Sequence, residues 1–176
     1  IQTVTITNTY STGDTEGDGR AERIIGRALG ADRSRAIIAT RTGPEHHTVT
    51  ELPLAVERSL KNLGTTWIDL YLLEGVPRLP VAEVLGQLAA IRKEGKIRAF
   101  GVALHGPESL AKAVAVTAAP PSCAMAPYSL LFRAAEEGLL PACAKHGIPM
   151  IASAPLMYGL LAGRFELADD VPPERA

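Results

Sequence analysis

The sequence predicts an α/β fold built on a parallel sheet. Short β-rich runs alternate with amphipathic helical stretches, and the strand centres recur about every 25–33 positions, the size of a β-α unit. Several strand candidates are apolar almost throughout, which is typical of strands buried on both faces of a parallel sheet. With 176 residues, 47% of them apolar and 21% charged, the chain has the composition of one globular domain, which we take as residues 1–176.

Six strands and five helices are expected, in alternation. The strand candidates are residues 3–7, 36–40, 68–73, 98–102, 123–126 and 149–153. The helix candidates are residues 21–29, 54–63, 81–93, 107–116 and 134–145. Gly30, Gly64 and Gly147 lie at or just beyond the ends of three of the helix candidates, and glycine favours the left-handed backbone that closes a helix. Pro107 opens the fourth helix, where the N–H that proline lacks is not needed.

Right-handed connections between parallel strands leave two architectures open, a closed barrel and an open doubly wound sheet. Periodicity alone does not choose between them. However, no G-x-G-x-x-G follows the first strand, since Gly17-Asp18-Gly19-Arg20 is only a turn signal. The sequence therefore disfavours a Rossmann-type dinucleotide-binding sheet.

Composition also excludes several classes of partner. The net charge of −1 provides no basic field for nucleic acid, and no apolar run approaches the roughly 20 residues needed to span a bilayer. Cys123 and Cys143 do not form a disulfide framework, so a reducing cytoplasm is the expected location. The adjacent His46 and His47 lack a third partner for a metal, and we expect no metal site.

Five segments resemble those of the aldo-keto reductase family and occur in the family's order. They are G-D-G-R-A-E at 17–22 with I-G-R-A-L at 25–29, L-K-N-L-G-T at 60–65 with I-D-L-Y at 68–71, G-K-I-R-A-F-G-V at 95–102, Y-S-L-L-F-R at 128–133, and P-L at 155–156 with G-L-L-A-G-R-F at 159–165. The resemblance implies a (β/α)₈ TIM barrel that reduces carbonyls with NADPH. Its catalytic tetrad of Asp, Tyr, Lys and His would lie at the carboxyl ends of the strands.

At the tetrad positions this resemblance finds other residues. Asn8 stands for the Asp, Glu16 for the Tyr, Arg41 for the Lys and Glu74 for the His. Because Arg is permanently charged and Asn carries no charge, the acid–base chemistry of the tetrad is not retained. The active site is thus expected to be degenerate, with Tyr10 as the nearest phenol.

The family's cofactor positions are also substituted. Ala103-Leu104 replaces a Ser-Asn pair, Met125 replaces the Gln that holds the carboxamide of the nicotinamide, and Ser153 replaces the Tyr that stacks on its ring. Leu156 follows in the cofactor loop. NADPH is the cofactor that the resemblance implies, and these substitutions argue against its binding.

The candidate catalytic residues are Glu74, Arg41, Glu16, Asn8 and His105. For Glu74 and Arg41 two interpretations stay open: an ion pair between adjacent strands, or a general base beside a guanidinium that binds a carboxylate or phosphate. Glu16 is either a solvated loop residue or catalytic, and His105 is either exposed or part of the pocket. We expect Asn8, Arg41, Glu74 and His105 to converge at one end of the sheet.

Three functions remain open. The first is a barrel that has lost hydride chemistry, binds a small-molecule ligand at its mouth and performs non-redox acid–base chemistry as a lyase, isomerase or cyclase. The second is an NADPH-dependent carbonyl or enone reductase, and the third is a non-catalytic binding or regulatory subunit. Because six strands do not close an eight-stranded barrel, we also expect a longer protein or a second chain, as in a homo-oligomer, to complete the fold.

Overall fold

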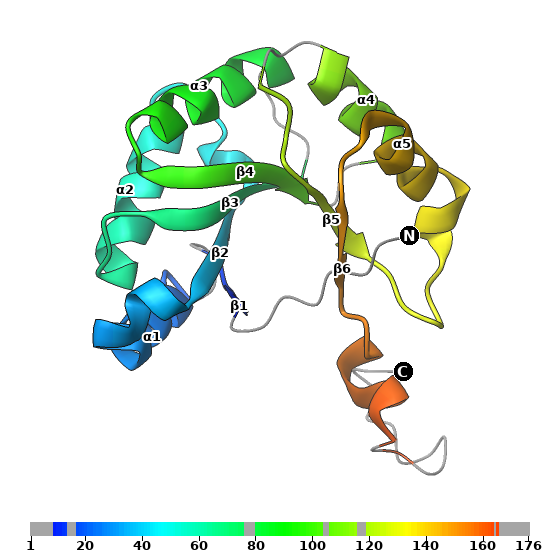
Figure 1. The fold of residues 1–176 in the computed structure, drawn as a ribbon, viewed down its shortest axis with the longest axis horizontal. Coiled ribbons are helices and arrows are strands. Elements are labelled where there is room, and N and C mark those ends of the chain that lie inside the picture. The colour runs from blue at the N-terminus through cyan, green and yellow to red at the C-terminus, as the bar shows by residue number, and fades with distance from the viewer. Residues whose placement is uncertain are drawn as a thin grey trace.

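The computed structural model describes residues 9–13, 17–75, 80–103, 106–115, 119–163 and 165. Within these ranges the strands form one six-stranded parallel sheet in the order β1-β2-β3-β4-β5-β6, so each strand pairs with the next in the chain (Figure 1). The strands are β1 (Thr9–Ser11), β2 (Ile37–Thr42), β3 (Ile68–Glu74), β4 (Ile97–Ala103), β5 (Ala124–Pro127) and β6 (Met150–Ser153). The α/β prediction is confirmed.

Five α-helices and four short 3₁₀ segments connect these strands. The α-helices are α1 (Arg20–Leu29), α2 (Glu51–Leu63), α3 (Val81–Lys93), α4 (Pro107–Ala115) and α5 (Leu139–His146). The 3₁₀ segments are η1 (Gly30–Arg35), η2 (Pro44–His46), η3 (Ala134–Glu137) and η4 (Met157–Ala162). The alternation of strand and helix therefore follows the sequence pattern.

Most boundaries agree with the sequence predictions to within two residues, and three elements need comment. The expected strand 3–7 lies outside the described residues, and the first described strand is Thr9–Ser11. Helix α2 begins at Glu51 rather than residue 54, since the backbone N–H of Glu51 donates to the Thr48 hydroxyl at 3.0 Å. The expected helix 134–145 is interrupted at Gly138, because Pro141 has no N–H to continue a helix across that point and is tolerated only in a first turn.

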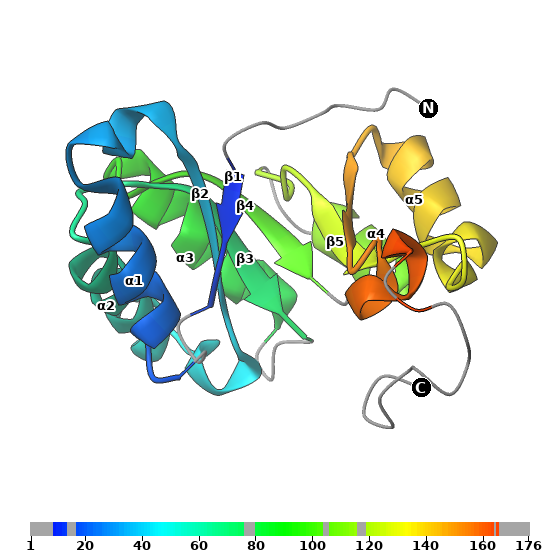
Figure 2. The same ribbon diagram turned by 90° about the horizontal axis from the view of Figure 1, so that it is seen from below.

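The sheet is curled, and its two faces differ. Helices α2, α3, α4 and α5 lie along the convex side, while the concave side carries no described helix (Figures 1 and 2). Two apolar clusters pack strand side chains against these helices, one around Tyr71 and Phe100 and the other around Val102 and Leu110. This is the arrangement of a (β/α) barrel that is open on one side.

Residues of the segment 17–29, the first of the five family-like segments, pack helix α1 against α2 and β2. A Cβ added at Gly26 would overlap the backbone of Leu63, so the two helices approach more closely than any larger residue allows. The Glu22 carboxylate is fully buried and accepts hydrogen bonds from the Thr40 hydroxyl at 2.7 Å and the Asn62 amide at 2.9 Å. The motif therefore has a packing role here, which holds β2 in position.

No helix in the described parts of the chain is long and apolar enough to cross a membrane.

Candidate active site

Arg41 and Glu74 meet at the carboxyl end of neighbouring strands. Arg41 is the penultimate residue of β2 and pairs in register with Leu72, so Glu74 lies two residues further along β3 on the same face. Arg41 Nε lies 2.8 Å from Glu74 Oε2, and the two side chains are 28% and 32% exposed. The ion-pair interpretation is thus confirmed, whereas the role of Glu74 as a general base stays a hypothesis, and both side chains remain partly exposed.

The end of β1 lies beside Arg41. The Thr12 N–H donates to the Ala39 carbonyl at 3.0 Å, which continues the β1–β2 pairing up to Thr12. A Cβ added at Gly13 would lie 3.1 Å from Cγ of Arg41, so the absence of a side chain at Gly13 makes room for the arginine.

Asn8 and Glu16 lie outside the described residues, and the same holds for His105. The described strand β1 follows Asn8 in the chain, so Thr12 and Gly13, which the sequence analysis missed, occupy its carboxyl end instead. The signal that could have found them is a lone glycine directly after a β-rich run. Convergence at one end of the sheet is thus established for Arg41 and Glu74 alone.

The loop after β2 is held to that strand by two histidines. His46 Nδ1 lies 3.1 Å from the Thr42 hydroxyl, and the buried His47 places Nε2 3.1 Å from the Thr42 carbonyl oxygen. Both imidazole rings therefore hold the loop that contains η2 against β2. In the part of the chain that the structure describes, no group of three His, Cys, Asp or Glu side chains could hold a metal ion.

A row of paired residues crosses the concave face near the carboxyl ends of the strands, from Glu74 on β3 to Ile151 on β6. Glu74 pairs with Ala103, Ala103 with Met125, and Met125 with Ile151. Met125 and Ile151 pack with Leu70 against the buried Leu72, Ala103 and Cys123. Burial raises the pKa of the Cys123 thiol to about 11, so this thiol stays protonated and unreactive at neutral pH.

Of the predicted cofactor positions, Met125 lies in this row, Ser153 ends β6 and Leu156 is exposed beyond it. Between Ala103 and Ile151 the row offers no side-chain hydrogen-bond donor or acceptor apart from the thioether of Met125. A nicotinamide carboxamide needs such partners, because an amide buried without them loses free energy. The row from Ala103 to Ile151 therefore does not fit the carboxamide, whereas Ser153, two residues beyond Ile151 on β6, carries a hydroxyl.

A hydrogen-bonded loop follows β5 at the same end of the sheet. The Tyr128 hydroxyl donates to Glu136 at 2.7 Å, and Arg133 donates to both oxygens of Glu136 at 2.9 Å. The hydrogen bonds from Arg133 and Tyr128 lower the pKa of Glu136. The turn between Tyr128 and Arg133 leaves three apolar side chains exposed, those of Leu130, Leu131 and Phe132.

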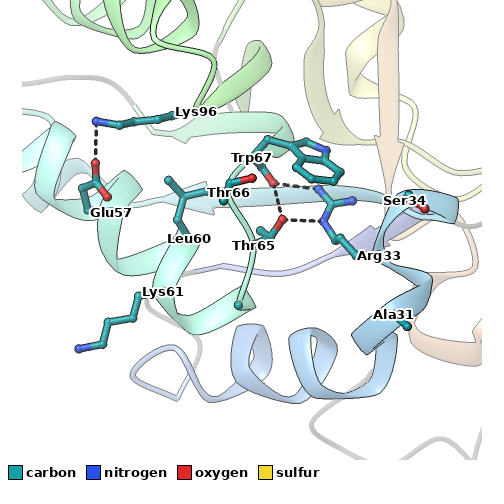
Figure 3. Close-up of a pocket in the computed structure, with 11 residues that line it drawn as sticks. Ala31, Arg33, Ser34, Glu57, Leu60, Lys61, Thr65, Thr66, Trp67 and Lys96 are labelled. Atoms are coloured by element: carbon teal, nitrogen blue, oxygen red, sulfur yellow. Dashed lines mark hydrogen bonds and ion pairs between the residues drawn. The ribbon is translucent and has the colours of Figure 1, made fainter.

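A shallow pocket lies near the start of β3, at the opposite end of the strands (Figure 3). There the Arg33 guanidinium stacks on the Trp67 ring at 4.5 Å and pairs with the buried Asp69 at 2.8 Å, and Arg98 pairs with the same carboxylate. Lys96 at the rim pairs with Glu57 and Glu94 at 2.7 Å each. Because Arg33, Asp69, Arg98, Lys96 and the two glutamates satisfy one another, we interpret these residues as structural.

The arrangement of these residues agrees with the sequence comparison. The sequence profile of the aldo/keto reductase family matches residues 3–176. The chain belongs to this family. It is similar to the aldo-keto reductase YhdN of Bacillus subtilis, with 33% identity over 159 residues, 84% of this chain and 47% of that protein. It is also similar to the aldo-keto reductase yakc [NADP(+)] of Schizosaccharomyces pombe, with 31% identity over 93% of this chain and 52% of that protein.

Solved aldo-keto reductases have the same fold. The Klebsiella pneumoniae enzyme in complex with NADP and acetate superposes with a TM-score of 0.84 at 30% identity, covering 92% of this chain and 58% of that chain. The glycerol dehydrogenase of Gluconobacter oxydans superposes with a TM-score of 0.84 at 28% identity, covering 95% and 55%. The chain therefore spans about half the length of these relatives, and its described sheet has six strands where the family's barrel has eight.

Proposed function

We propose that this chain forms the ligand-binding end of an aldo-keto-reductase-type barrel that binds a small molecule and serves proton transfer rather than hydride transfer. The observation that carries the proposal is the Arg41–Glu74 ion pair at the mouth, with Nε and Oε2 2.8 Å apart. The family resemblance expects Lys and His at these positions. Elimination, isomerisation and cyclisation are the reaction classes that fit, since each needs a base beside the substrate.

In this proposal Glu74 is the base and Arg41 orients it. Arg41 stays charged at every physiological pH, so it cannot exchange a proton with substrate. Its contact with Oε2 restrains the Glu74 carboxylate from one side while a third of that side chain remains exposed toward the mouth. The substrate proton would pass to the carboxylate of Glu74.

NADPH-dependent reduction of a carbonyl or an enone is the second candidate. It is favoured by relatives: the fission yeast protein is named for NADP(+), and the Klebsiella enzyme was solved with NADP. Tyr10 would then be the proton donor. Tyr10 lies within β1, in register with Ile38, rather than at the carboxyl end of the strand, which favours the first candidate.

Two measurements separate these functions. The first is NADPH titration followed by the cofactor's own fluorescence, which is preferable to Trp67 because that ring lies at the opposite end of the strands. We expect no saturable binding of NADPH. We also expect negligible NADPH oxidation with a panel of aldehydes, ketones and enones, because the ~10²–10⁴-fold rate enhancement of a positioned general acid would be missing. Oxidation at rates ordinary for the family would establish the second candidate instead.

The second measurement is exchange of carbon-bound hydrogen for deuterium in a panel of small carbonyl compounds, followed by NMR. We expect exchange that Glu74→Gln abolishes and that Glu83→Gln, at an exposed position of α3, leaves unchanged. Ligand binding without exchange in any compound would instead leave a non-catalytic binding subunit.

A further inference from the structure

The pocket near the start of β3 contains groups that the proposed function does not use (Figure 3). Its volume of about 780 Å³ is in the range of small-molecule sites. It is lined by η1, by the end of α2 and by the loop that leads into β3. We call it the amino-end pocket, because it lies at the amino end of the strands, away from Arg41 and Glu74.

The charges around the amino-end pocket leave one cation in excess. In the ion pairs described above, two guanidinium groups share the carboxylate of Asp69, which gives a net charge of +1, and the ammonium of Lys96 lies between two carboxylates, which gives −1. These two groups cancel. Lys61 also lines the pocket, has no ion pair with any side chain in the described ranges, and stands apart from the other sticks in Figure 3. The net charge of the whole set is therefore that of Lys61.

The end of α2 does not oppose an anion beside Lys61. The last carbonyl groups of a helix carry partial negative charge and would repel an anion if they were unpaired. Here the Leu60 carbonyl accepts from the Thr65 N–H at 3.1 Å, and the Lys61 carbonyl accepts from the Gly64 N–H at 3.2 Å. Gly64 adopts the left-handed backbone that this turn requires, with φ 62°. The turn thus satisfies both carbonyls, and the ammonium of Lys61 remains to attract an anion.

The rest of the lining is apolar or carries hydroxyl groups. Leu60 and the Trp67 ring provide apolar surface, and Ala31 adds a methyl group. Ser34 and Thr66 line the same pocket, and both are exposed. A hydroxyl group can donate a hydrogen bond to a carboxylate. The amino-end pocket therefore combines an apolar wall, hydroxyl donors and one ammonium group without a counter-ion.

We propose that the amino-end pocket binds a small monocarboxylate with a short apolar body. The carboxylate pairs with Lys61 and accepts hydrogen bonds from the exposed hydroxyl groups, while the apolar body lies along Leu60 and Trp67. One negative charge balances the excess of +1, whereas a cationic ligand would be repelled by it. This site goes beyond the proposed function and does not depend on it, because it lies at the opposite end of the strands.

Fluorescence of Trp67 tests whether such a ligand binds, because Trp67 is the single tryptophan of the chain and lines the pocket. The probes are hexanoate, hexanol and hexylammonium, which share an alkyl body and differ in the charge of the head group. We expect a saturable change of Trp67 emission with hexanoate, a lower affinity for hexanol and the lowest for hexylammonium. No saturable change with hexanoate, or an equal affinity for hexylammonium, would overturn the proposal.

Substitution of Lys61 tests the counter-ion. Lys61→Gln should weaken hexanoate binding about fivefold, the upper range for an exposed ion pair, and leave hexanol binding unchanged. Lys61→Arg should keep the preference for hexanoate, since it keeps the charge. Lys112→Gln is the matched control, because Lys112 is likewise an exposed lysine in the last turn of a helix, α4. Unchanged hexanoate binding by Lys61→Gln, or equal weakening by Lys112→Gln, would contradict the role of Lys61.

A variant at the mouth separates this site from the proposed function. Glu74→Gln should abolish hydrogen exchange if the proposed function is right, and it should leave the response of Trp67 to hexanoate unchanged in either case. A hexanoate response that disappears in Glu74→Gln would place the ligand at the mouth and overturn the proposal. Circular dichroism of each variant ensures that a loss of binding is not a loss of fold.

Discussion

Arg41 and Glu74 show how a pair of adjacent strand ends determines local chemistry. The two side chains are more than two-thirds buried, and their opposite charges lie in direct contact. Breaking such a pair costs more than the pair contributes, because one charge is left without compensation. The Glu74→Gln variant used above therefore needs a folding control, and the exposed Glu83 provides a matched one.

Cys123 provides a prediction about pH. Burial raises its pKa from 9.0 to about 11, so in that interval the unfolded chain has released the thiol proton while the folded chain retains it. Unfolding then releases a proton, and the free energy of unfolding falls as pH rises through this window, by at most ~1.4 kcal/mol per unit. Below pH 9 both the folded and the unfolded chain retain the thiol proton, so this loss of stability is absent.

Cys123→Ala isolates this effect, since it removes the thiol and leaves the other alkaline groups in place. Urea unfolding on either side of the window should show a smaller loss of stability for the variant than for the unaltered chain. Parallel loss in both proteins would mean that the thiol does not contribute.

Among the elements, the contact between α1 and α2 depends on a missing side chain. Gly26 faces the backbone of Leu63, whereas Gly86, in the middle of α3, has no atom within 4 Å of an added Cβ. We predict that Gly26→Ala lowers the free energy of unfolding by ~1–3 kcal/mol, as overpacking does. Gly86→Ala should raise it by ~0.5–1 kcal/mol, because alanine favours the helix.

Denaturant midpoints measure both substitutions under the same conditions. Opposite signs are expected for the two glycines even though both replacements are chemically identical. If Gly26→Ala also stabilised the protein, α1 and α2 would have to be further apart than in this structure.

For the whole molecule, the sheet has two unpaired edges among the described strands. In the described residues β1 pairs with β2 alone and β6 with β5 alone, and the apolar concave face lies between them. Exposed edges of this kind pair with other chains. We predict that these 176 residues associate through these edges. Analytical ultracentrifugation and thermal unfolding test this, and a monodisperse compact monomer with a steep transition would contradict it.

Sequence patterns alone determined the alternation of strands and helices, the parallel sheet and most element boundaries. These are local properties: the apolar period selects strand or helix, and glycine or proline marks the ends. The ion pair was also predictable, because Arg41 and Glu74 stand at the ends of consecutive parallel strands and such ends meet at one edge.

Tertiary structure decided what depends on register and on close approach between distant segments. The pairing of Thr12 with Ala39 places Gly13 beside Arg41, and no local pattern contains that register. The row from Glu74 to Ile151 likewise exists only after four strands pair. Sequence shows which residues end a strand, but strand pairing determines which of them share a surface, because register joins residues that are far apart in the chain.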